Sequence, residues 1–242
     1  MTMRGKERTE QRKFALITGT SLMIMMVAAI FSYGIVHQSL QVQGDASTTL
    51  QNIISKHLLL HAEILGWIII LICDIVAAWS LYVFLKPVDP NLSLLAAWLR
   101  LAYAALLGIA IMNLIYLQLV TSNPADCQSF VTIDQLHGQV LLNLRAFDSM
   151  WSVGLIVFGG HLLIVGILTL QSKTMPKWIG VLMCAAAVSY FIIHVGKIML
   201  PAHSDIMMIL ERVLIVPMTA GELGFGIWLL FRGGKPLLDP AE

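Results

Sequence analysis

Charged residues are scarce in this chain of 242 residues. They make up 12% of the sequence, against roughly 25% in soluble domains, while hydrophobic residues make up 58%. The formal net charge of +1 provides no basic field of the kind that nucleic-acid binding requires. This composition excludes a soluble enzyme, a disordered chain and a nucleic-acid partner, and it predicts an integral membrane protein.

Cysteine is also rare. Cys73, Cys127 and Cys184 lie far apart, without a CxxC motif or the Cys/His spacing of a zinc site. The HExxH, GxSxG, P-loop and dinucleotide-binding fingerprints are absent as well. These absences exclude a secreted disulfide scaffold, and they give no support to a conventional enzyme class.

Long apolar runs dominate what is present, and six of them reach the length of about 20 residues that a bilayer requires. The first follows a basic segment, as in a signal peptide, but its length of about 23 residues exceeds the usual 7 to 15. We therefore expect it to be retained, and we predict an all-α integral membrane bundle of six transmembrane helices. The predicted spans are residues 14–36, 58–85, 92–120, 137–170, 178–199 and 209–231.

Lysine and arginine in the segments that connect these spans fall almost entirely on one side of the predicted topology. Cytoplasmic loops collect such residues, and six spans place both termini on the same side. We expect residues 1–13 and 232–242 to be cytoplasmic segments that flank a membrane domain of residues 14–231 in a bacterial cell membrane. The opposite side contains Lys56 alone. The ten residues on the cytoplasmic side are Arg4, Lys6, Arg8, Arg12, Lys13, Lys86, Lys173, Lys177, Arg232 and Lys235.

Four ionisable residues lie deep within different predicted spans. Measured from the cytoplasmic end of its own helix, Asp74 is about 16 Å in, Arg100 about 12 Å, and His161 and Glu222 about 14 Å. A charge near the bilayer centre costs about 2.5 to 3.5 kcal/mol even on insertion scales, so each needs an explanation. The short segment Lys86–Asn91 joins two of these spans. We therefore expect Asp74 and Arg100 to form an ion pair.

The four groups are open to three interpretations. In the first, they surround a polar cavity that binds a small ligand or relays protons, with Glu222 and His161 titrating as a coupled pair. In the second, they only fix helix packing, and Glu222 is protonated or bonded to His161. In the third, an intramembrane enzyme uses Asp74, His161 and Glu222 on a lipid-like substrate. The first is our prediction, with Asp74, Arg100, His161 and Glu222 as the ligand- or proton-binding candidates.

Three further charged residues lie at the outer ends of the spans. Glu63 and Asp148 are each about 33 Å from the cytoplasmic end of their helix, and Arg145 is farther still, beyond a hydrocarbon core of about 30 Å. We assign all three to the membrane interface. Arg145 and Asp148 are three residues apart, so we expect them to form a charge pair on one helix face.

Aromatic and histidine residues add two expectations. Tyr190 lies about 18 Å from the cytoplasmic end of its span and can add a hydroxyl group to the polar layer. His161 and His194 differ in depth by about 10 Å, which is too far for both to bind one haem iron. We therefore predict no cofactor and no metal. The expected partners are membrane lipids and a small-molecule ligand.

Five short motifs place acidic, arginine and histidine residues at specific points in apolar helices. They are Ala62–Gly66 (AEILG), Cys73–Trp79 (CDIVAAW), Leu94–Arg100 (LLAAWLR), Ala146–Asp148 (AFD) and Gly159–Leu162 (GGHL). Together they resemble a bacterial membrane family known as domain of unknown function 4386, over roughly residues 14–231. The resemblance implies a multi-span membrane fold and names no activity. It therefore strengthens the predicted architecture, while the function has to be argued from the ionisable residues.

Overall fold

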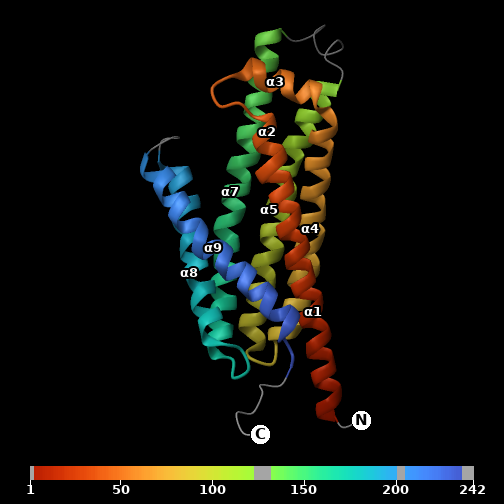
Figure 1. Cartoon of the computed structure of the whole chain (residues 1–242), viewed down its shortest axis with the longest axis vertical. Helices are drawn as coiled ribbons and strands as arrows, with labels where there is room; N and C mark the ends of the chain where they lie inside the picture. The colour runs from red at the N-terminus through yellow and green to blue at the C-terminus, as the bar shows by residue number, and fades with distance from the viewer. Residues whose placement is uncertain (1–2, 123–131, 201–204, 236–242) are drawn as a thin grey trace. The chain divides into compact units, whose positions relative to one another are not determined.

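The computed structural model describes residues 3–122, 132–200 and 205–235. This part of the chain is helical and contains no strand (Figure 1), which confirms the all-α prediction. The elements are α1 (Met3–Ala29), the π-helix η1 (Ile30–His37), α2 (Gln38–Leu40), α3 (Ala46–Ser55), α4 (His57–Leu85), α5 (Pro90–Ser122), α7 (Ile133–Gln171), α8 (Lys177–Met199) and α9 (Asp205–Phe231).

Within the described residues, six helical segments are long and apolar enough to cross a membrane, which confirms the six-span prediction. Large apolar side chains lie exposed along them: Ile35 is 60% exposed, Leu119 62% and Val216 65%. Such surfaces suit lipid tails and would be costly in water. The spans are Thr9–Leu40, His57–Leu85, Pro90–Ser122, Ile133–Gln171, Lys177–Met199 and Ile206–Phe231.

The chain divides into two compact units, each built from separate stretches of sequence. The first unit consists of Met1–Ile24, Cys73–Ala104 and Ser152–Glu242. The second consists of Met25–Ile72 and Ala105–Trp151. The candidate residues Asp74, Arg100, His161 and Glu222 therefore all belong to the first unit.

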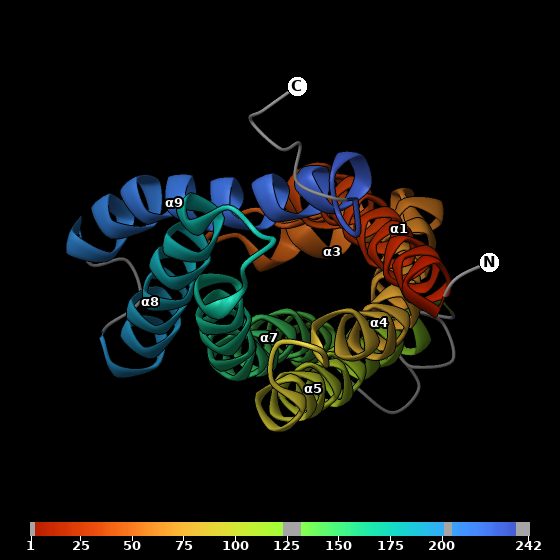
Figure 2. The same ribbon diagram turned by 90° about the horizontal axis from the view of Figure 1, so that it is seen from below.

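Short turns join neighbouring helices of the first unit, as Figure 2 shows for α4 and α5. The turn after Leu85 leads directly into α5, whose first backbone amides are capped by an aspartate. Asp89 Oδ1 accepts hydrogen bonds from the backbone N–H groups of Asn91 and Leu92, at 2.9 and 3.0 Å. A carboxylate suits this place because it satisfies amides that have no partner within the helix.

The start of α1 is tied to the end of α9 within the first unit. Arg12 donates from Nη1 to the backbone carbonyls of Leu229 and Gly233, at 3.0 and 2.9 Å. Carbonyls in the last turn of a helix lack intrahelical donors, so the guanidinium supplies what this end of α9 requires. Gly234 follows with φ of +71°, and a Cβ atom there would lie 2.6 Å from the Arg12 backbone nitrogen. The two ends of the membrane domain are therefore adjacent in this unit.

Helices α8 and α9 lie side by side (Figures 1 and 2). At their contact, a Cβ atom on Gly221 would lie 3.0 Å from both the Ala186 Cβ and the Leu182 carbonyl oxygen. Only a glycine allows the two backbones to approach this closely, as in many membrane helix pairs. Because Glu222 follows Gly221 directly, this contact places the Glu222 backbone next to α8.

The second unit contains the end of α1, η1, α2, α3 and the adjoining parts of α4, α5 and α7. Its largest buried side chains include Trp67 and Phe147, which are 1% and 0% exposed. Asp45 caps α3 by accepting from the Thr48 backbone N–H at 2.9 Å. The hydrogen bonds from Thr48 also hold the pKa of the Asp45 carboxyl below its usual value.

Candidate functional site

The predicted ion pair between Asp74 and Arg100 is present in the first unit. Arg100 Nη2 lies 2.7 Å from Asp74 Oδ1, and the two side chains are 3% and 2% exposed. Asp74 belongs to α4 and Arg100 to α5, so the short turn between these helices brings the charges together. The guanidinium carbon also lies 5.4 Å from the centre of the Phe158 ring, at a distance suited to a cation–π contact.

His161 holds the other side of the Arg100 guanidinium. Its Nε2 atom lies 3.1 Å from Arg100 Nη1, and its Nδ1 atom lies 2.8 Å from the Ala96 carbonyl oxygen. A guanidinium N–H only donates and a carbonyl oxygen only accepts. His161 Nε2 therefore accepts and Nδ1 donates, which defines a neutral imidazole of one tautomer. Adding a proton to Nε2 would break the bond to Arg100.

Glu222 takes a different partner from the one we expected. Tyr190 Oη donates to Glu222 Oε1 at 2.5 Å, a length typical of a hydroxyl donating to a carboxylate. No hydrogen bond joins Glu222 to His161 within the part of the chain that the structure describes. The physical reason is the Gly221 contact, which packs α9 against α8, where Tyr190 lies. The hydroxyl group that we expected Tyr190 to add is therefore the one that binds Glu222.

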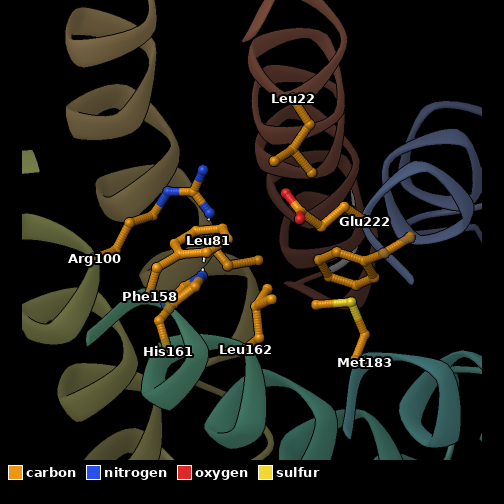
Figure 3. Close-up of a pocket in the computed structure, with 9 residues that line it drawn as sticks. Leu22, Leu81, Arg100, Phe158, His161, Leu162, Met183 and Glu222 are labelled. Atoms are coloured by element: carbon orange, nitrogen blue, oxygen red, sulfur yellow. Dashed lines mark hydrogen bonds between the residues drawn. The ribbon is translucent and has the colours of Figure 1, made fainter. Parts of the chain in front are cut away.

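Arg100, His161 and Glu222 line one small cavity in the first unit (Figure 3). The guanidinium of Arg100 and the carboxylate of Glu222 point into the same space from α5 and α9 (Figure 3). The cavity has a volume of about 10 Å³, close to the room that one water molecule requires. Asp74 belongs to the site through its ion pair with Arg100. The remaining lining is apolar: Leu22, Leu81, Phe158, Leu162, Met183 and Phe225.

Phe158 is a central residue of this site that sequence reasoning missed. Its ring stacks on His161 with 5.6 Å between ring centres and meets Tyr190 edge to face at 5.4 Å. Phe158 therefore contacts the Arg100 guanidinium and the partners of both Arg100 and Glu222. A phenylalanine three residues before a histidine in an apolar span carries no distinctive signal.

The site has one acid without a cationic partner of its own. Asp74 and Arg100 balance each other, and His161 is neutral, so the charge of the cluster depends on Glu222. An ionised Glu222 gives the cluster a net charge of −1, whereas a protonated Glu222 leaves it neutral. Among the described residues, no group of three or more His, Cys, Asp or Glu side chains is placed to hold a metal ion.

The outer charged residues lie in the second unit. The charge pair between Arg145 and Asp148 stays a prediction: Arg145 is exposed on α7, and Asp148 Oδ1 lies 3.8 Å from His37 Nε2. Glu63, which we expected at the membrane interface, is 1% exposed and lies 2.7 Å from His37. No sequence pattern pointed to His37, because its partner is 26 residues away on another helix.

A family model described as Domain of unknown function (DUF4386) matches residues 17–233 of the chain. The chain belongs to this family. The predicted resemblance is therefore confirmed, and the matched range includes all four candidate residues of the site.

A relative described as "Uncharacterized protein" occurs in the archaeon Archaeoglobus fulgidus. It is 29% identical over 175 residues, which cover 72% of this chain and 85% of the relative. No solved structure matches the chain. The comparisons thus assign the chain to the DUF4386 family without naming an activity, and its function has to be inferred from the residues of the site.

Proposed function

We propose that this DUF4386 protein binds a proton within the membrane at Glu222 and exchanges it, as part of a site for protons or a small polar ligand. One observation carries the proposal: the Glu222 carboxyl faces a cavity the size of one water molecule, opposite an arginine already neutralised by Asp74. A proton is the ligand that matches this charge balance, because its binding makes the cluster neutral.

Opposing forces act on the Glu222 carboxyl. The Tyr190 hydroxyl donates to its ionised form, and the Arg100 guanidinium across the cavity attracts that form. The apolar lining, with Leu22, Met183 and Phe225, favours the neutral form instead. These influences oppose each other, and their balance sets the proton affinity of the carboxyl.

The other candidate residues take positioning roles in this proposal. Asp74 balances the Arg100 charge, and His161 directs the guanidinium by accepting from Nη1 while it donates to the Ala96 carbonyl. This network links α4, α5 and α7, and it also favours the alternative of a purely structural cluster for Asp74, Arg100 and His161. The cavity volume of about 10 Å³ favours a proton over the lipid-like substrate of an intramembrane enzyme.

Infrared difference spectroscopy tests the proposal directly. When the pH of the protein in lipid nanodiscs is lowered, a carbonyl stretching band of a buried, protonated carboxyl group should appear. The band should be missing in Glu222→Gln and shifted in Tyr190→Phe, because Tyr190 donates to the same carboxyl. Glu211→Gln is the matched control, since Glu211 is 44% exposed and pairs with Lys197 at 3.2 Å. An unchanged band in a folded Glu222→Gln variant would contradict the proposal.

We also propose that both termini of this multi-pass membrane protein lie in the cytoplasm of the cell. Ten basic residues on one side against one on the other support this orientation, as do the bonds from Arg12 to the end of α9, which hold both ends of the domain together. A reporter fused at Lys86 should report cytoplasm, and one fused at Asp126, outside the described residues, should report the opposite side. The reverse pattern would reject the orientation.

A further inference from the structure

A second group of ionisable side chains lies inside the second unit. His37 Nδ1 is 2.7 Å from Glu63 Oε1, and His37 Nε2 is 3.8 Å from Asp148 Oδ1. His37 and Glu63 are 2% and 1% exposed, whereas the Asp148 side chain is 38% exposed with its Oδ1 atom buried. The three residues come from η1, α4 and α7, so the cluster depends on the packing of three separate segments.

Aromatic rings surround His37 and Glu63. Tyr33 stacks on His37 at 5.3 Å, and Phe147 lies 5.6 Å from the imidazole centre. Trp67 packs against Phe147 at 5.1 Å and against Trp151 at 4.9 Å. Ring faces attract a cation, and they also exclude water from the charges beside them. The enclosure therefore suits a charged imidazolium better than it suits two bare carboxylates.

Two ring N–H groups lie near one oxygen of Glu63. The Trp67 indole N–H only donates, and it lies 3.4 Å from the same Oε1 atom that His37 approaches. An ionised Glu63 can accept hydrogen bonds from both neighbours at Oε1. A neutral His37 would leave Glu63 and Asp148 as two negative charges around one imidazole. An imidazolium offers an N–H group to each carboxylate, so a proton on His37 relieves this repulsion.

The backbone holds His37 in this place by two unusual features. η1 is a π-helix of eight residues, a form that occurs mostly as single turns and often at functional sites. η1 also approaches α4 at Gly66, where a Cβ atom would lie 2.0 Å from Ser32 Oγ and 3.3 Å from Ser32 Cβ. This approach brings His37 within hydrogen-bond distance of Glu63, three residues before Gly66.

We propose that His37, Glu63 and Asp148 form a separate proton-binding site, in which the bound proton is shared between the His37 imidazole and the Glu63 carboxylate. The titratable groups that face His37 are Glu63 from α4, Asp148 from α7 and Tyr33 from η1 itself. The hydrogen bond of 2.7 Å between His37 Nδ1 and Glu63 Oε1 is the path for the shared proton, and Glu63 Oε2 is buried without a hydrogen bond from any described residue.

The position of the cluster gives the proton a short route to the membrane edge. His37 is three residues, about 5 Å, from the end of the first span at Leu40. Glu63 is six residues, about 9 Å, from the start of α4 at His57. The site is made of different residues from those around Glu222 and does not rest on that proposal.

Nitrogen-15 NMR of histidine-labelled protein in lipid bilayers tests the second site. The His37 signal is identified by its loss in His37→Gln, and at pH 7 it should show both ring nitrogens protonated. In Glu63→Gln the proton affinity of His37 should fall at least about tenfold, because the variant removes the nearest negative charge. Asp148→Asn should lower it by a smaller factor, since Asp148 lies 1.1 Å farther from the ring, at 3.8 Å against 2.7 Å.

One control variant and two possible contradicting results keep the test decisive. Glu211→Gln, which neutralises an exposed acid of the first unit, should leave the His37 signal unchanged. The spectrum of the unaltered protein is informative even if Glu63→Gln does not fold, because a neutral His37 at pH 7 would overturn the proposal. Equal proton affinity of His37 in folded Glu63→Gln and in the unaltered protein would overturn it as well. Neither outcome depends on Glu222, so the two proposals can fail independently.

Discussion

Replacement of Arg100 by leucine is expected to destabilise the protein by about 3 to 5 kcal/mol. Asp74 is 2% exposed, and its nearest cation is Arg100 at 2.7 Å, so the variant leaves a buried carboxylate without its counter-charge. His161 Nε2 also loses the N–H group that it accepts from. Asp74→Asn should be destabilising by a comparable amount, because it leaves the guanidinium buried and unmatched.

The double variant Asp74→Asn/Arg100→Leu should be less destabilised than the sum of the two single variants. Each single change removes the same ion pair, so the coupling free energy should reach about 0.5 to 3 kcal/mol. Reversible unfolding of the four proteins in detergent micelles measures it. Lys197→Leu and Glu211→Gln provide the matched control, because that exposed pair should couple by no more than about 1 kcal/mol. Additive effects at Asp74 and Arg100 would reject a mutually stabilising pair.

Glu222→Gln is expected to abolish proton flux through the reconstituted protein. The variant keeps the size of the side chain and removes the group that gains and loses the proton. Flux into liposomes that contain a pH-sensitive dye should therefore fall to the rate of protein-free vesicles. His161→Ala should abolish it too, since Arg100 then loses the acceptor that directs it at the cavity. Tyr190→Phe keeps the carboxyl, so flux should remain with an altered pH dependence.

Glu211→Gln is the control for neutralising an acid outside the cavity, and its flux should match that of the unaltered protein. Circular dichroism and size-exclusion chromatography establish that each variant remains folded. Two results would contradict proton transport at Glu222. One is undiminished flux in a folded Glu222→Gln variant, and the other is a flux in the unaltered protein no faster than that of empty vesicles.

Architecture was the part of this protein that could be predicted from its sequence. The thickness of the bilayer sets the length of a spanning helix, so six apolar runs were enough to predict the six spans. The family followed from short motifs, and the match to residues 17–233 confirmed it. The ion pair of Asp74 and Arg100 was also predictable, because a short turn forces α4 and α5 to be neighbours and leaves their relative depth as the main variable.

Contacts between helices that are distant in sequence were decided by tertiary packing. Counting residues from a helix end measures depth along one axis, but it does not show which way a side chain points around that axis. Glu222 and His161 line one cavity, but Glu222 bonds to Tyr190 because Gly221 packs α9 against α8. His161 is directed at Arg100 by the Ala96 carbonyl, which no sequence pattern reveals.

The cluster of His37, Glu63 and Asp148 shows most clearly that depth along a helix does not reveal which side chains meet. By depth alone Glu63 and Asp148 were assigned to the interface, and Arg145 was the only partner expected for Asp148. The structure buries Glu63 against His37 because η1 and α4 meet at Gly66, while α7 supplies Asp148 and Phe147. The length of a spanning helix is a local property, because the thickness of the bilayer fixes how many consecutive apolar residues it needs. The pairing of charges on helices that no short turn joins depends on how those helices rotate and pack against each other, and only the folded chain determines that.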